Sequence, residues 1–478
     1  MNDYEQLIEM MFADGTLDQS VRQEIEGMND LQKRLHIVKI LDKGLGLFTK
    51  IEDIINLPKF DYIKEVIKLL KDYVLIADVE KEKFGEVMTP LILIKDMLSV
   101  LPQDVWSNPE LKWLDSCNGT GPYPIMVIYK LMNGLKDWEP DDEKRYKYIL
   151  EKMIYVGEIQ PKNMFLYMNA VDPINEYNLN IYTGSFLEKE FDIQMSNTWN
   201  VSKFDIVIGN PPYNQMIDML FLQKSYKISD RVLYVHPSTW LLDEKGKQKK
   251  FNETKELIKN NLESIKLFNG NGIFAISLFV PCVITYVNKY KKTNVIKCND
   301  LINDVEIYYN SIFEVNKFSD SFIYPNLVKK IKSKIKYSLL DRLNDNNDNF
   351  IYFINIPQIR GDVKNRDKRD TGMNEKMISD NFYTLSTKSL DVEYSSRQQS
   401  FIFETIEESI NFLNYTKTYF ARFCLSIYKN NQNLHRGELS IIPFMDFKRE
   451  WTDLDLIKYY NLDDNEVEFI MKNIPKYY

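Results

Sequence analysis

The chain has 478 residues, which is enough for roughly two to four domains. Hydrophobic residues make up 44% and charged residues 27%, so the chain can bury a sizeable core and is not a disordered one. The formal net charge is −8, which argues against a chain that is basic throughout. Contacts with nucleic-acid phosphates would have to come from local basic segments.

The four cysteines and three histidines are scattered, and no two cysteines form a C-x-x-C motif. We therefore expect neither a metal site nor a disulfide framework. The N-terminus carries early acids and lacks the basic segment and apolar stretch of a secretory signal. The most apolar run, 274–287, is shorter than the ~20 residues that span a bilayer and contains a proline. These features predict a reduced, cytoplasmic protein that does not enter a membrane.

Residues 1–75 are predicted to be helical, because apolar residues recur there at three- and four-residue spacing. Over 76–300, short apolar strands alternate with helical stretches, which predicts an α/β domain with a mostly parallel sheet. Residues 301–478 are rich in Asn, Asp, Tyr and Lys and show no such alternation, so we expect a separate, mixed α+β domain. The expected strands are 111–114, 153–156, 179–183, 204–208 and 232–235.

A glycine-rich turn follows the first expected strand. Asp115–Gly121 reads DSCNGTG, of the form D-x-x-x-G-x-G. The glycines permit a tight turn and a close approach of the backbone to a ligand, and amides at a helix start favour an anionic group. An ordinary turn between a strand and a helix, without a role in ligand binding, would show the same sequence pattern.

Two further motifs follow the next strands. Glu158 ends the second expected strand, where a carboxylate can accept both hydroxyls of a ribose. An exposed acid at a helix start is the alternative. Ser185 and Phe186 follow the third strand, where they could contact an adenine edge and face, although Phe186 taken alone is more typical of a core residue than of a ligand contact.

The most specific motif is Asn210-Pro211-Pro212-Tyr213, which directly follows the apolar strand 204–208. Prolines have fixed φ angles and no N–H, so their carbonyls are rigid and have no neighbouring donor. The Asn210 side-chain oxygen and the Pro211 carbonyl can together accept the two N–H groups of an aromatic amine. That arrangement favours a directed lone pair on a nitrogen that is otherwise a poor nucleophile. Tyr213 can stack on a base that has left the duplex.

The ordered set FGEVMTP (84–90), DSCNGTG, VGE, TGSF and IGNPPY resembles the gamma-class N6-adenine DNA methyltransferases of type II and IIG restriction–modification systems. The resemblance covers about 80–290, with a weaker similarity in the tail. It implies a Rossmann-like fold that binds S-adenosyl-L-methionine and a C-terminal target-recognition domain. It also implies double-stranded DNA as partner and leaves room for a separate restriction endonuclease, whereas the oligomeric state is not predicted.

The resemblance implies roles by position. The segment 84–90 would close over the methionine end of the cofactor, the glycine-rich turn would hold the methionine moiety and Glu158 the ribose. Asn210 to Tyr213 would hold the target base, and Phe274 would form its second aromatic wall, with Phe279 as the alternative. The implied cofactor-binding residues are Phe84, Thr89, Pro90, Asp115, Asn118, Gly119, Gly121, Glu158, Ser185, Phe186 and Asn210.

Three residues depart from the family pattern. Ser116 stands where proline is usual, Asn118 where a small residue is usual, and Ser185 where an aspartate is usual. Serine can still hydrogen-bond an adenine amine but offers no carboxylate, so cofactor affinity is expected to be reduced.

Basic segments are the candidates for DNA contact. Residues 329–342 contain six Lys or Arg against one acid, and residues 360–369 contain five against two. The loop 245–250 is a third candidate. Each could equally be a solvated surface. The candidate DNA-binding residues are Lys247, Lys249, Lys250, Lys332, Lys336, Arg360, Lys364, Arg366, Lys368 and Arg369.

Two other functions remain open from the sequence. Asn-Pro-Pro-Tyr also serves methylation of glutamine amides in proteins and of amines in RNA, but the long extension past residue 300 favours DNA. A degenerate methyltransferase fold could act only as a DNA-binding specificity subunit, and the three departures are compatible with that. The intact Asn210-Pro211-Pro212-Tyr213 favours an enzyme.

Overall fold

The computed structural model divides the chain into two compact units, 1–238 with 252–301 and 239–251 with 302–478. Each unit is described by itself. The residues that the structure describes are 3–42, 50–76, 89–241, 248–268, 270, 282–301, 305–315, 317–318, 321–322, 325–342, 352–356, 399–428 and 436–474.

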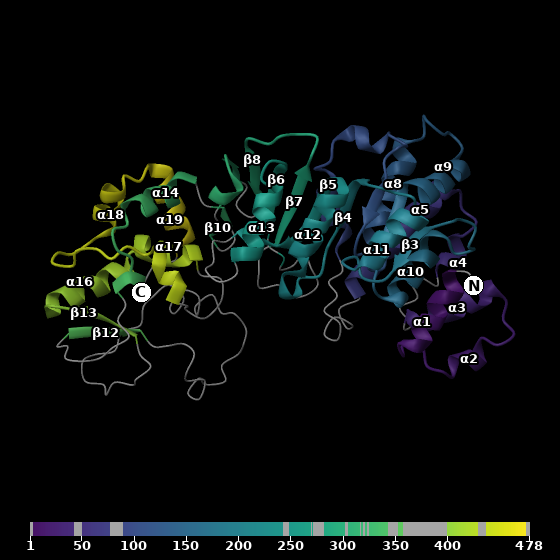
Figure 1. The fold of residues 1–478 in the computed structure, drawn as a ribbon, viewed down its shortest axis with the longest axis horizontal. Helices are drawn as coiled ribbons and strands as arrows, with labels where there is room; N and C mark the ends of the chain where they lie inside the picture. Colours follow the sequence, from purple (N-terminus) through teal and green to yellow (C-terminus); the bar gives the residue numbers. More distant parts are fainter. Residues whose placement is uncertain are drawn as a thin grey trace. The chain divides into compact units, whose positions relative to one another are not determined.

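The first unit is built on a mixed sheet (Figure 1). Among its described residues, eight strands follow the order β3-β2-β1-β4-β5-β7-β6-β8. The first five are parallel, β7 is antiparallel to both β5 and β6, and β8 is parallel to β6. The strands are β1 (Trp113–Asp115), β2 (Ile154–Glu158), β3 (Asn180–Thr183), β4 (Phe204–Gly209), β5 (Ser229–Pro237), β6 (Leu262–Phe268), β7 (Cys282–Asn288) and β8 (Ile296–Asp300).

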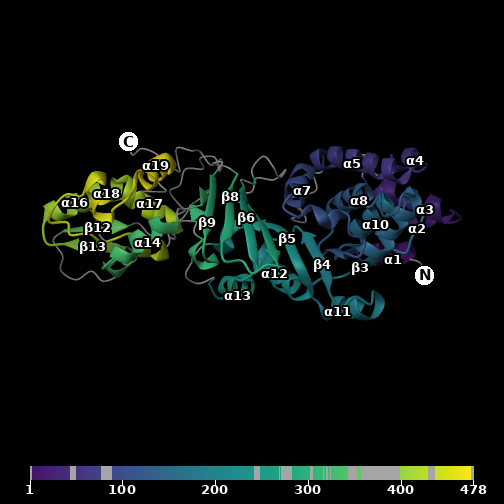
Figure 2. The same ribbon diagram turned by 90° about the horizontal axis from the view of Figure 1, so that it is seen from above.

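Helices cover both faces of this sheet. They are α1 (Asp3–Ala13), α2 (Val21–Glu24), α3 (Asp30–Leu41), α4 (Ile51–Ile54), α5 (Lys59–Ile76), α7 (Leu91–Leu98), α8 (Pro122–Gly134), α9 (Asp142–Tyr148), α10 (Pro161–Val171), α11 (Lys189–Ile193) and α12 (Ile217–Ile228), followed by α13 (Gln248–Ile258). Figure 2 shows α5, α7, α8 and α10 on one side of the sheet and α11 and α12 on the other. The central parallel strands β1, β2 and β4 are therefore buried on both faces, as a parallel sheet requires, whereas the edge strand β3 is half-buried.

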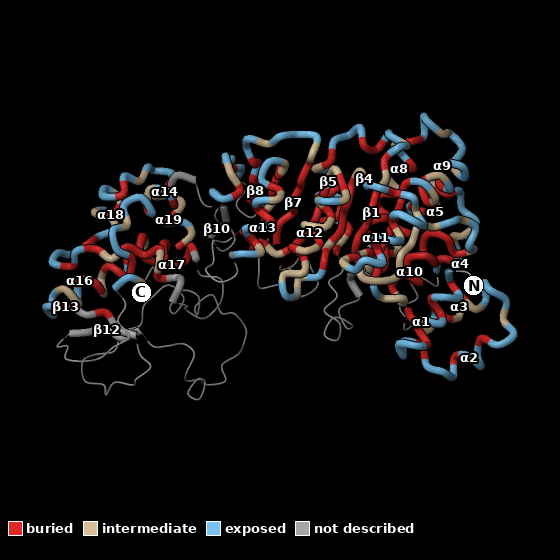
Figure 3. The backbone as a smooth tube through the Cα atoms, viewed as in Figure 1, coloured by how far each residue is buried: buried red, intermediate tan, exposed pale blue. Residues whose placement is uncertain are grey.

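The core of the first unit runs through these layers, with the strands coloured as buried in Figure 3. The N-terminal helices join it, with α1 and α3 packed against α10 and α5 packed against α8 and α9. Two buried tyrosines anchor them, since Tyr4 donates to the Asp172 carbonyl at 2.9 Å and Tyr62 donates to the Ala170 carbonyl at 2.7 Å. The helical nature of the N-terminal region is confirmed for its described residues.

The second unit mixes helices with short strands around its own apolar core. Its described elements are β9 (Val305–Tyr309), β10 (Lys317–Phe318), β11 (Ser321–Phe322), α14 (Pro325–Lys334), β12 (Tyr352–Ile356), β13 (Gln399–Phe403), α16 (Ile406–Lys417), α17 (Tyr419–Tyr428), α18 (Asp453–Tyr460) and α19 (Asp464–Asn473). Helices α18 and α19 both start with a capping box, at Thr452 and Asp463, which satisfies amides that a helix start leaves unpaired.

The expected fold class is confirmed, although the bounds of all five expected strands differ by one to three residues, as β1 and β5 illustrate. β1 is 113–115 rather than 111–114, and β5 is 229–237 rather than 232–235. β5 is longer because it hydrogen-bonds along its length to β4 on one side and β7 on the other. The strands β6, β7 and β8 were not predicted individually.

None of the helices within the described ranges combines the length and hydropathy needed to cross a membrane. The same residues contain no group of three His, Cys, Asp or Glu side chains placed to hold a metal ion.

Candidate active site

The sequence motifs meet at one edge of the sheet. Asp115, Glu158, Thr183 and Gly209 end β1, β2, β3 and β4, which are neighbouring parallel strands. Because the carboxyl ends of parallel strands lie at the same edge, the four motifs that follow them are brought together. This is the edge at which open α/β sheets bind their ligands.

The glycine-rich turn depends on backbone conformations that favour glycine. Gly119 has φ +54° and Gly121 has φ +95°, both in the left-handed region. A Cβ atom on Gly121 would lie 2.3 Å from Cδ2 of Tyr167, which is buried. Gly121 is also the residue directly before α8, and Pro122 begins that helix. The turn is thus packed so closely that a side chain at Gly121 cannot be accommodated without movement.

The Glu158 carboxylate ties the second strand to this turn. Its Oε2 accepts a hydrogen bond from the Gly119 amide at 2.7 Å, and its Oε1 accepts one from the Gln160 amide at 2.9 Å. These bonds orient the carboxylate at the carboxyl end of β2. A carboxylate has about four lone-pair sites, so it can accept further donors from a ligand.

Asp115 is almost wholly buried at the end of β1. Its Oδ1 accepts the amide of Cys117 at 3.1 Å. Burial raises the pKa of Asp115 from 3.8 to about 8, and the nearby charge of Glu158 adds to the rise. The carboxyl is therefore mostly protonated at neutral pH unless a cation or a strong donor approaches it.

Three buried polar atoms of this turn have no hydrogen-bond partner among the described residues: Asp115 Oδ2, Asn118 Oδ1 and Thr120 Oγ1. Unpaired buried polar groups are costly, and they often mark a place where a ligand or water supplies the partner. The donor set of a ligand with ammonium, amine or hydroxyl groups, such as S-adenosyl-L-methionine, fits these acceptors. The residues present therefore fit that cofactor.

The amide of Asn210 is held between two hydroxyl groups. Its Nδ2 donates to Thr89 Oγ1 at 3.0 Å, and its Oδ1 accepts from the Tyr213 hydroxyl at 2.6 Å. Thr89 is itself buried, and so is Pro211, whereas Pro212 is exposed. These two contacts fix the orientation of the amide, with its oxygen on the same side as the Tyr213 hydroxyl.

The strand that carries Asn210 approaches the glycine-rich turn closely. Gly209 has φ +151°, and a Cβ there would lie 2.9 Å from Cys117 Sγ and 3.1 Å from Asp115 Oδ1. The Asn210 backbone also contacts the Cys117 thiol, whose pKa is raised by burial. The Asn210 residue and the buried carboxyl of β1 thus belong to one compact site.

Backbone strain follows directly after Tyr213. Gln215 and Met216 have φ values of +53° and +61°, although neither is a glycine. Such conformations cost about 1–3 kcal/mol each and cluster at functional sites. The strained pair connects the Asn-Pro-Pro-Tyr segment to α12, so a movement of Tyr213 would be coupled to this turn.

Below α12, a buried polar group holds the helix to the sheet. His236 on β5 contacts Thr285 Oγ1 on β7 at 2.7 Å through Nε2 and Asp218 Oδ2 on α12 at 3.3 Å through Nδ1. All three residues are buried. Asp218 also contributes to the raised pKa of Tyr213, which is caused mainly by burial.

Ser185 and Phe186 lie at the end of β3, in the positions that the sequence predicted. The Ser185 hydroxyl accepts the Leu187 amide at 3.3 Å and so stabilises the turn. Phe186 is only 1% exposed, and its ring packs against Phe191 at 4.8 Å and Phe221 at 5.0 Å. Phe186 therefore forms part of the core beneath the site in this conformation, and its contact with a cofactor stays a prediction.

Two side-chain roles were not foreseen from the sequence. Thr89 was assigned to the cofactor, and the structure joins it to Asn210, 121 residues later. Ser116, which departs from the family pattern, bonds to the Tyr234 hydroxyl at 2.5 Å, and Tyr234 bonds to Ser225 at 2.6 Å. A serine at this position is thus satisfied by partners that no sequence signal connects to it.

The structure describes four of the ten candidate DNA-binding residues. Of the candidate DNA-binding residues, Lys249, Lys332 and Lys336 are exposed and Lys250 is partly exposed, all in the second unit. The predicted residues that lie outside the described ones are Phe84, Phe274, Phe279, Lys247, Arg360, Lys364, Arg366, Lys368 and Arg369.

The raised pKa of Asp115 predicts a pH dependence of stability. Between its ordinary pKa of 3.8 and about 8, the folded state keeps a proton that the unfolded chain releases. The contribution of Asp115 to stability is therefore complete below 3.8 and is lost as the pH rises through 8. The Asp115→Asn variant does not lose stability in this way, because asparagine has no carboxyl group to titrate. From pH 5 to 7, we expect its free energy of unfolding relative to wild type to rise by about 1.4 kcal/mol per pH unit.

Denaturant unfolding of both proteins at pH 5, 6 and 7 measures this difference, and the comparison cancels the titration of all other groups. If the free energies of wild type and Asp115→Asn changed in parallel with pH, the carboxyl would not be protonated in the folded state.

Comparison with known proteins shows what the part of the chain around this site is similar to. Residues 68–239 match the N-6 DNA Methylase family. The chain is 26% identical over 193 residues to an uncharacterized adenine-specific methylase of Mycoplasma pneumoniae, and the match covers 27% of this chain and 46% of that protein. The chain thus spans about half the length of the curated relative it matches.

Solved structures show more distant likenesses. A modification subunit of a putative type I restriction enzyme from Vibrio vulnificus is 18% identical with a TM-score of 0.40, over 55% of this chain and 64% of that one. A putative class I S-adenosylmethionine-dependent methyltransferase from Listeria monocytogenes is 13% identical with a TM-score of 0.35, over 55% and 86%. Neither value is high enough to bear on function. The family match covers all four motifs around the site and agrees with the resemblance to N6-adenine DNA methyltransferases drawn from the sequence: residues 68–239 are similar to the N-6 DNA Methylase family.

Proposed function

We propose that this chain is a site-specific DNA methyltransferase that transfers a methyl group from S-adenosyl-L-methionine to the N6 amine of an adenine in double-stranded DNA. The observation that carries the proposal is the Asn210 amide, which Thr89 fixes at the end of β4 beside the buried carboxyl of Asp115. The family match over 68–239 supports the same class of reaction.

The chemistry required of Asn210 follows from the electronic structure of adenine. The lone pair of an aromatic amine is delocalised into the ring, so the nitrogen is a weak nucleophile. Two fixed acceptors, the Asn210 side-chain oxygen and the Pro211 carbonyl, would accept its two N–H groups and direct the lone pair away from the ring. Acceptors aimed in advance at a charge that develops during reaction give a large catalytic effect. The amine becomes acidic once methylated, so no strong base is needed.

Tyr213 would contribute to the site in two ways. Its ring offers a flat surface for a base that has left the duplex. Its hydroxyl donates to the Asn210 oxygen at 2.6 Å, so it holds the acceptor in place before the substrate binds. An incoming adenine amine would replace this hydroxyl, and the strained residues Gln215 and Met216 lie next to the segment that would move.

The cofactor would be held by residues at the ends of β1 and β2. When bound, S-adenosyl-L-methionine supplies the electrophilic methyl group. The glycine-rich turn offers the unpaired acceptors of Asp115 and Asn118 to the methionine moiety, and the carboxylate of Glu158 would accept the ribose hydroxyls. Pairing with an ammonium group would favour the ionised form of Asp115, which burial otherwise disfavours.

Double-stranded DNA is the proposed partner of the whole chain. Lys249, Lys332 and Lys336 expose their side chains in the second unit, where they could contact phosphates. Such contacts position the protein on the duplex, while contacts to base edges would determine the sequence that is methylated. A separate endonuclease could act with the chain in a restriction–modification system.

The substrate class can be tested with a labelled cofactor. We expect purified protein incubated with methyl-labelled S-adenosyl-L-methionine to transfer label to double-stranded DNA from a host that lacks the modification. Total RNA and a protein extract, in separate reactions, should stay unlabelled. Label that enters only RNA or only protein would reject DNA as the substrate, and label in none of the three would indicate a DNA-binding subunit without activity.

The role of Asn210 can be tested against a matched variant of its partner. Asn210→Ala removes the acceptor oxygen, so we expect the rate of transfer to DNA to fall on the order of 10²-fold or more while the cofactor still binds. Tyr213→Phe keeps the ring and leaves the Asn210 oxygen available, and we expect it to retain much more activity than Asn210→Ala. Single-turnover rates and cofactor titration measure the two effects. Equal losses in both variants would contradict the assignment of the acceptor to Asn210.

A further inference from the structure

One face of the sheet in the first unit is polar at a distance from the active site. Ser264 on β6 pairs with Tyr286 on β7 and with Lys297 on β8, and Lys266 pairs with Asn299 on β8. Residues that pair directly across neighbouring strands point to the same face of a sheet. The face formed by β7, β6 and β8 therefore carries lysine, serine, tyrosine and asparagine side chains where a fully covered sheet would be apolar.

A cavity of about 630 Å³ opens on this face. It is formed by β6, β7 and β8, by the connection from β7 to β8 and by Val100 after α7. None of its lining residues belongs to the motifs of the active site. The lining residues are Val100, Glu263, Ser264, Lys266, Tyr286, Lys291, Lys292, Thr293, Asn294, Val295, Lys297 and Asn299.

The charge of the cavity is positive. Its lining contains four lysines and a single carboxylate, Glu263, which pairs with Lys291 at 2.7 Å. Lys266 has a pKa lowered by burial and further by Lys297, whereas Asp96 opposes the shift. Lys266 and Lys292 make no hydrogen bond or ion pair with any described residue. An anionic ligand would therefore give Lys266 and Lys292 the charged partner that no hydrogen bond or ion pair with a described residue gives them.

The cavity also contains hydrogen-bonding groups suited to oxygen-rich ligands. Thr293 Oγ1 is enclosed and has no partner among the described residues. Burial raises the pKa of Tyr286 to about 12, so its hydroxyl keeps its proton at neutral pH and can donate. The carboxylates of Glu263 and Asp104 add to that rise, whereas the Arg231 guanidinium on β5 opposes it.

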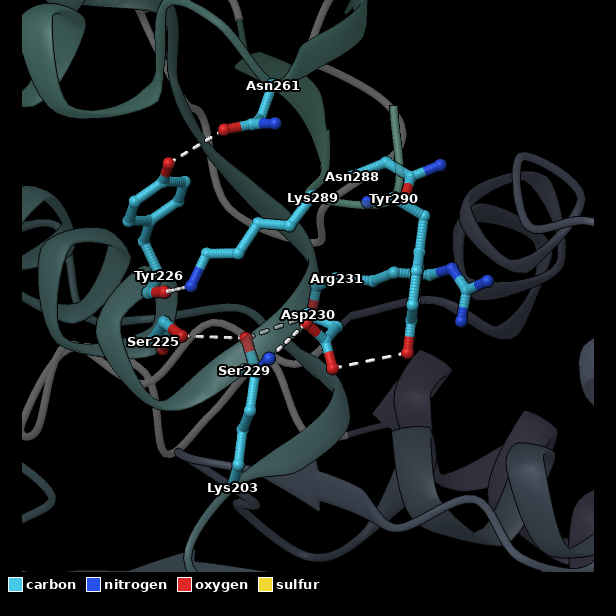
Figure 4. Close-up of polar contacts among 10 residues, drawn as sticks. All are labelled: Lys203, Ser225, Tyr226, Ser229, Asp230, Arg231, Asn261, Asn288, Lys289 and Tyr290. Atoms are coloured by element: carbon cyan, nitrogen blue, oxygen red, sulfur yellow. Dashed lines mark hydrogen bonds and ion pairs between the residues drawn. The ribbon is translucent and has the colours of Figure 1, made fainter. Parts of the chain in front are cut away.

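The basic residues just outside the cavity differ from Lys266 and Lys292, because they already have interaction partners. Figure 4 shows Lys289 donating to the Tyr226 carbonyl and Lys203 paired with Asp230, at the start of β5 and the end of β7. The Arg231 guanidinium lies over the Tyr290 ring, 4.5 Å from its centroid. These basic side chains thus have partners already, whereas Lys266 and Lys292 in the cavity have no hydrogen bond or ion pair with a described residue.

We propose that this cavity binds a small anionic ligand that carries several phosphate groups, of the class of polyphosphates. Several phosphates offer partners to Lys266 and Lys292 together, and their oxygens accept from hydroxyl groups as well as from ammonium groups. The volume is within the usual range for small-molecule sites. A duplex backbone would instead present its phosphates along an extended surface.

The test uses inorganic tripolyphosphate, which contains no adenine and so cannot imitate the proposed methyl donor. We expect the full-length protein to bind it in calorimetric titration at physiological ionic strength. The double variant Lys266→Gln, Lys292→Gln should weaken this binding by about tenfold or more, because it removes two charge-assisted contacts. The control Lys144→Gln, Lys147→Gln removes the same charge from two exposed positions of α9, and its affinity should stay within about twofold of wild type.

A parallel titration with duplex DNA separates the two sources of phosphate. An affinity for duplex that is unchanged in the Lys266, Lys292 variant supports a small-ligand site. Loss of duplex affinity without loss of tripolyphosphate affinity would overturn it in favour of a DNA-backbone contact. Absence of tripolyphosphate binding to the wild type, or an equal loss in the control variant, would also overturn it. Circular dichroism of the variants verifies that each is folded.

Discussion

The hydrogen bond from Asn210 Nδ2 to Thr89 Oγ1 determines how the proposed active site is arranged. An amide side chain can turn either its nitrogen or its oxygen toward a substrate, and only the oxygen can accept an amine. With its nitrogen bound to Thr89, Asn210 faces its oxygen toward Tyr213. The site therefore depends on the segment before α7, which supplies Thr89, as much as on the Asn-Pro-Pro-Tyr motif itself.

Other features of the site lower the stability of the fold, as is common where a protein binds a ligand. Asp115 is buried with one oxygen unpaired, and Asn118 and Thr120 each bury an unpaired oxygen in the same turn. Gln215 and Met216 hold strained backbone angles beside Tyr213. Buried, unpaired groups and local strain lower the stability of a fold, and both are concentrated here at the carboxyl ends of β1 and β4.

The sequence predicted the elements whose signal is local. The apolar runs before Asp115, Glu158 and Gly209 identified three of the parallel strands, and the glycines at 119 and 121 identified the turn. Contacts between distant segments could not be predicted, because periodicity has no information about them. The Thr89–Asn210 bond and the hydroxyl pair of Ser116 and Tyr234 are of this kind. The antiparallel insertion of β7 between β5 and β6 was also missed, since strand order depends on the whole sheet.

The most direct measurement of the central claim is the identity of the methylated base. Duplex DNA incubated with the protein and S-adenosyl-L-methionine can be digested to nucleosides and analysed by mass spectrometry with chromatographic separation. The arrangement of Asn210 and Pro211 as acceptors for an exocyclic amine predicts N6-methyldeoxyadenosine as the product. Methylation at a ring carbon, such as C5 of cytosine, would contradict the account, because no exocyclic amine would then take part in the reaction.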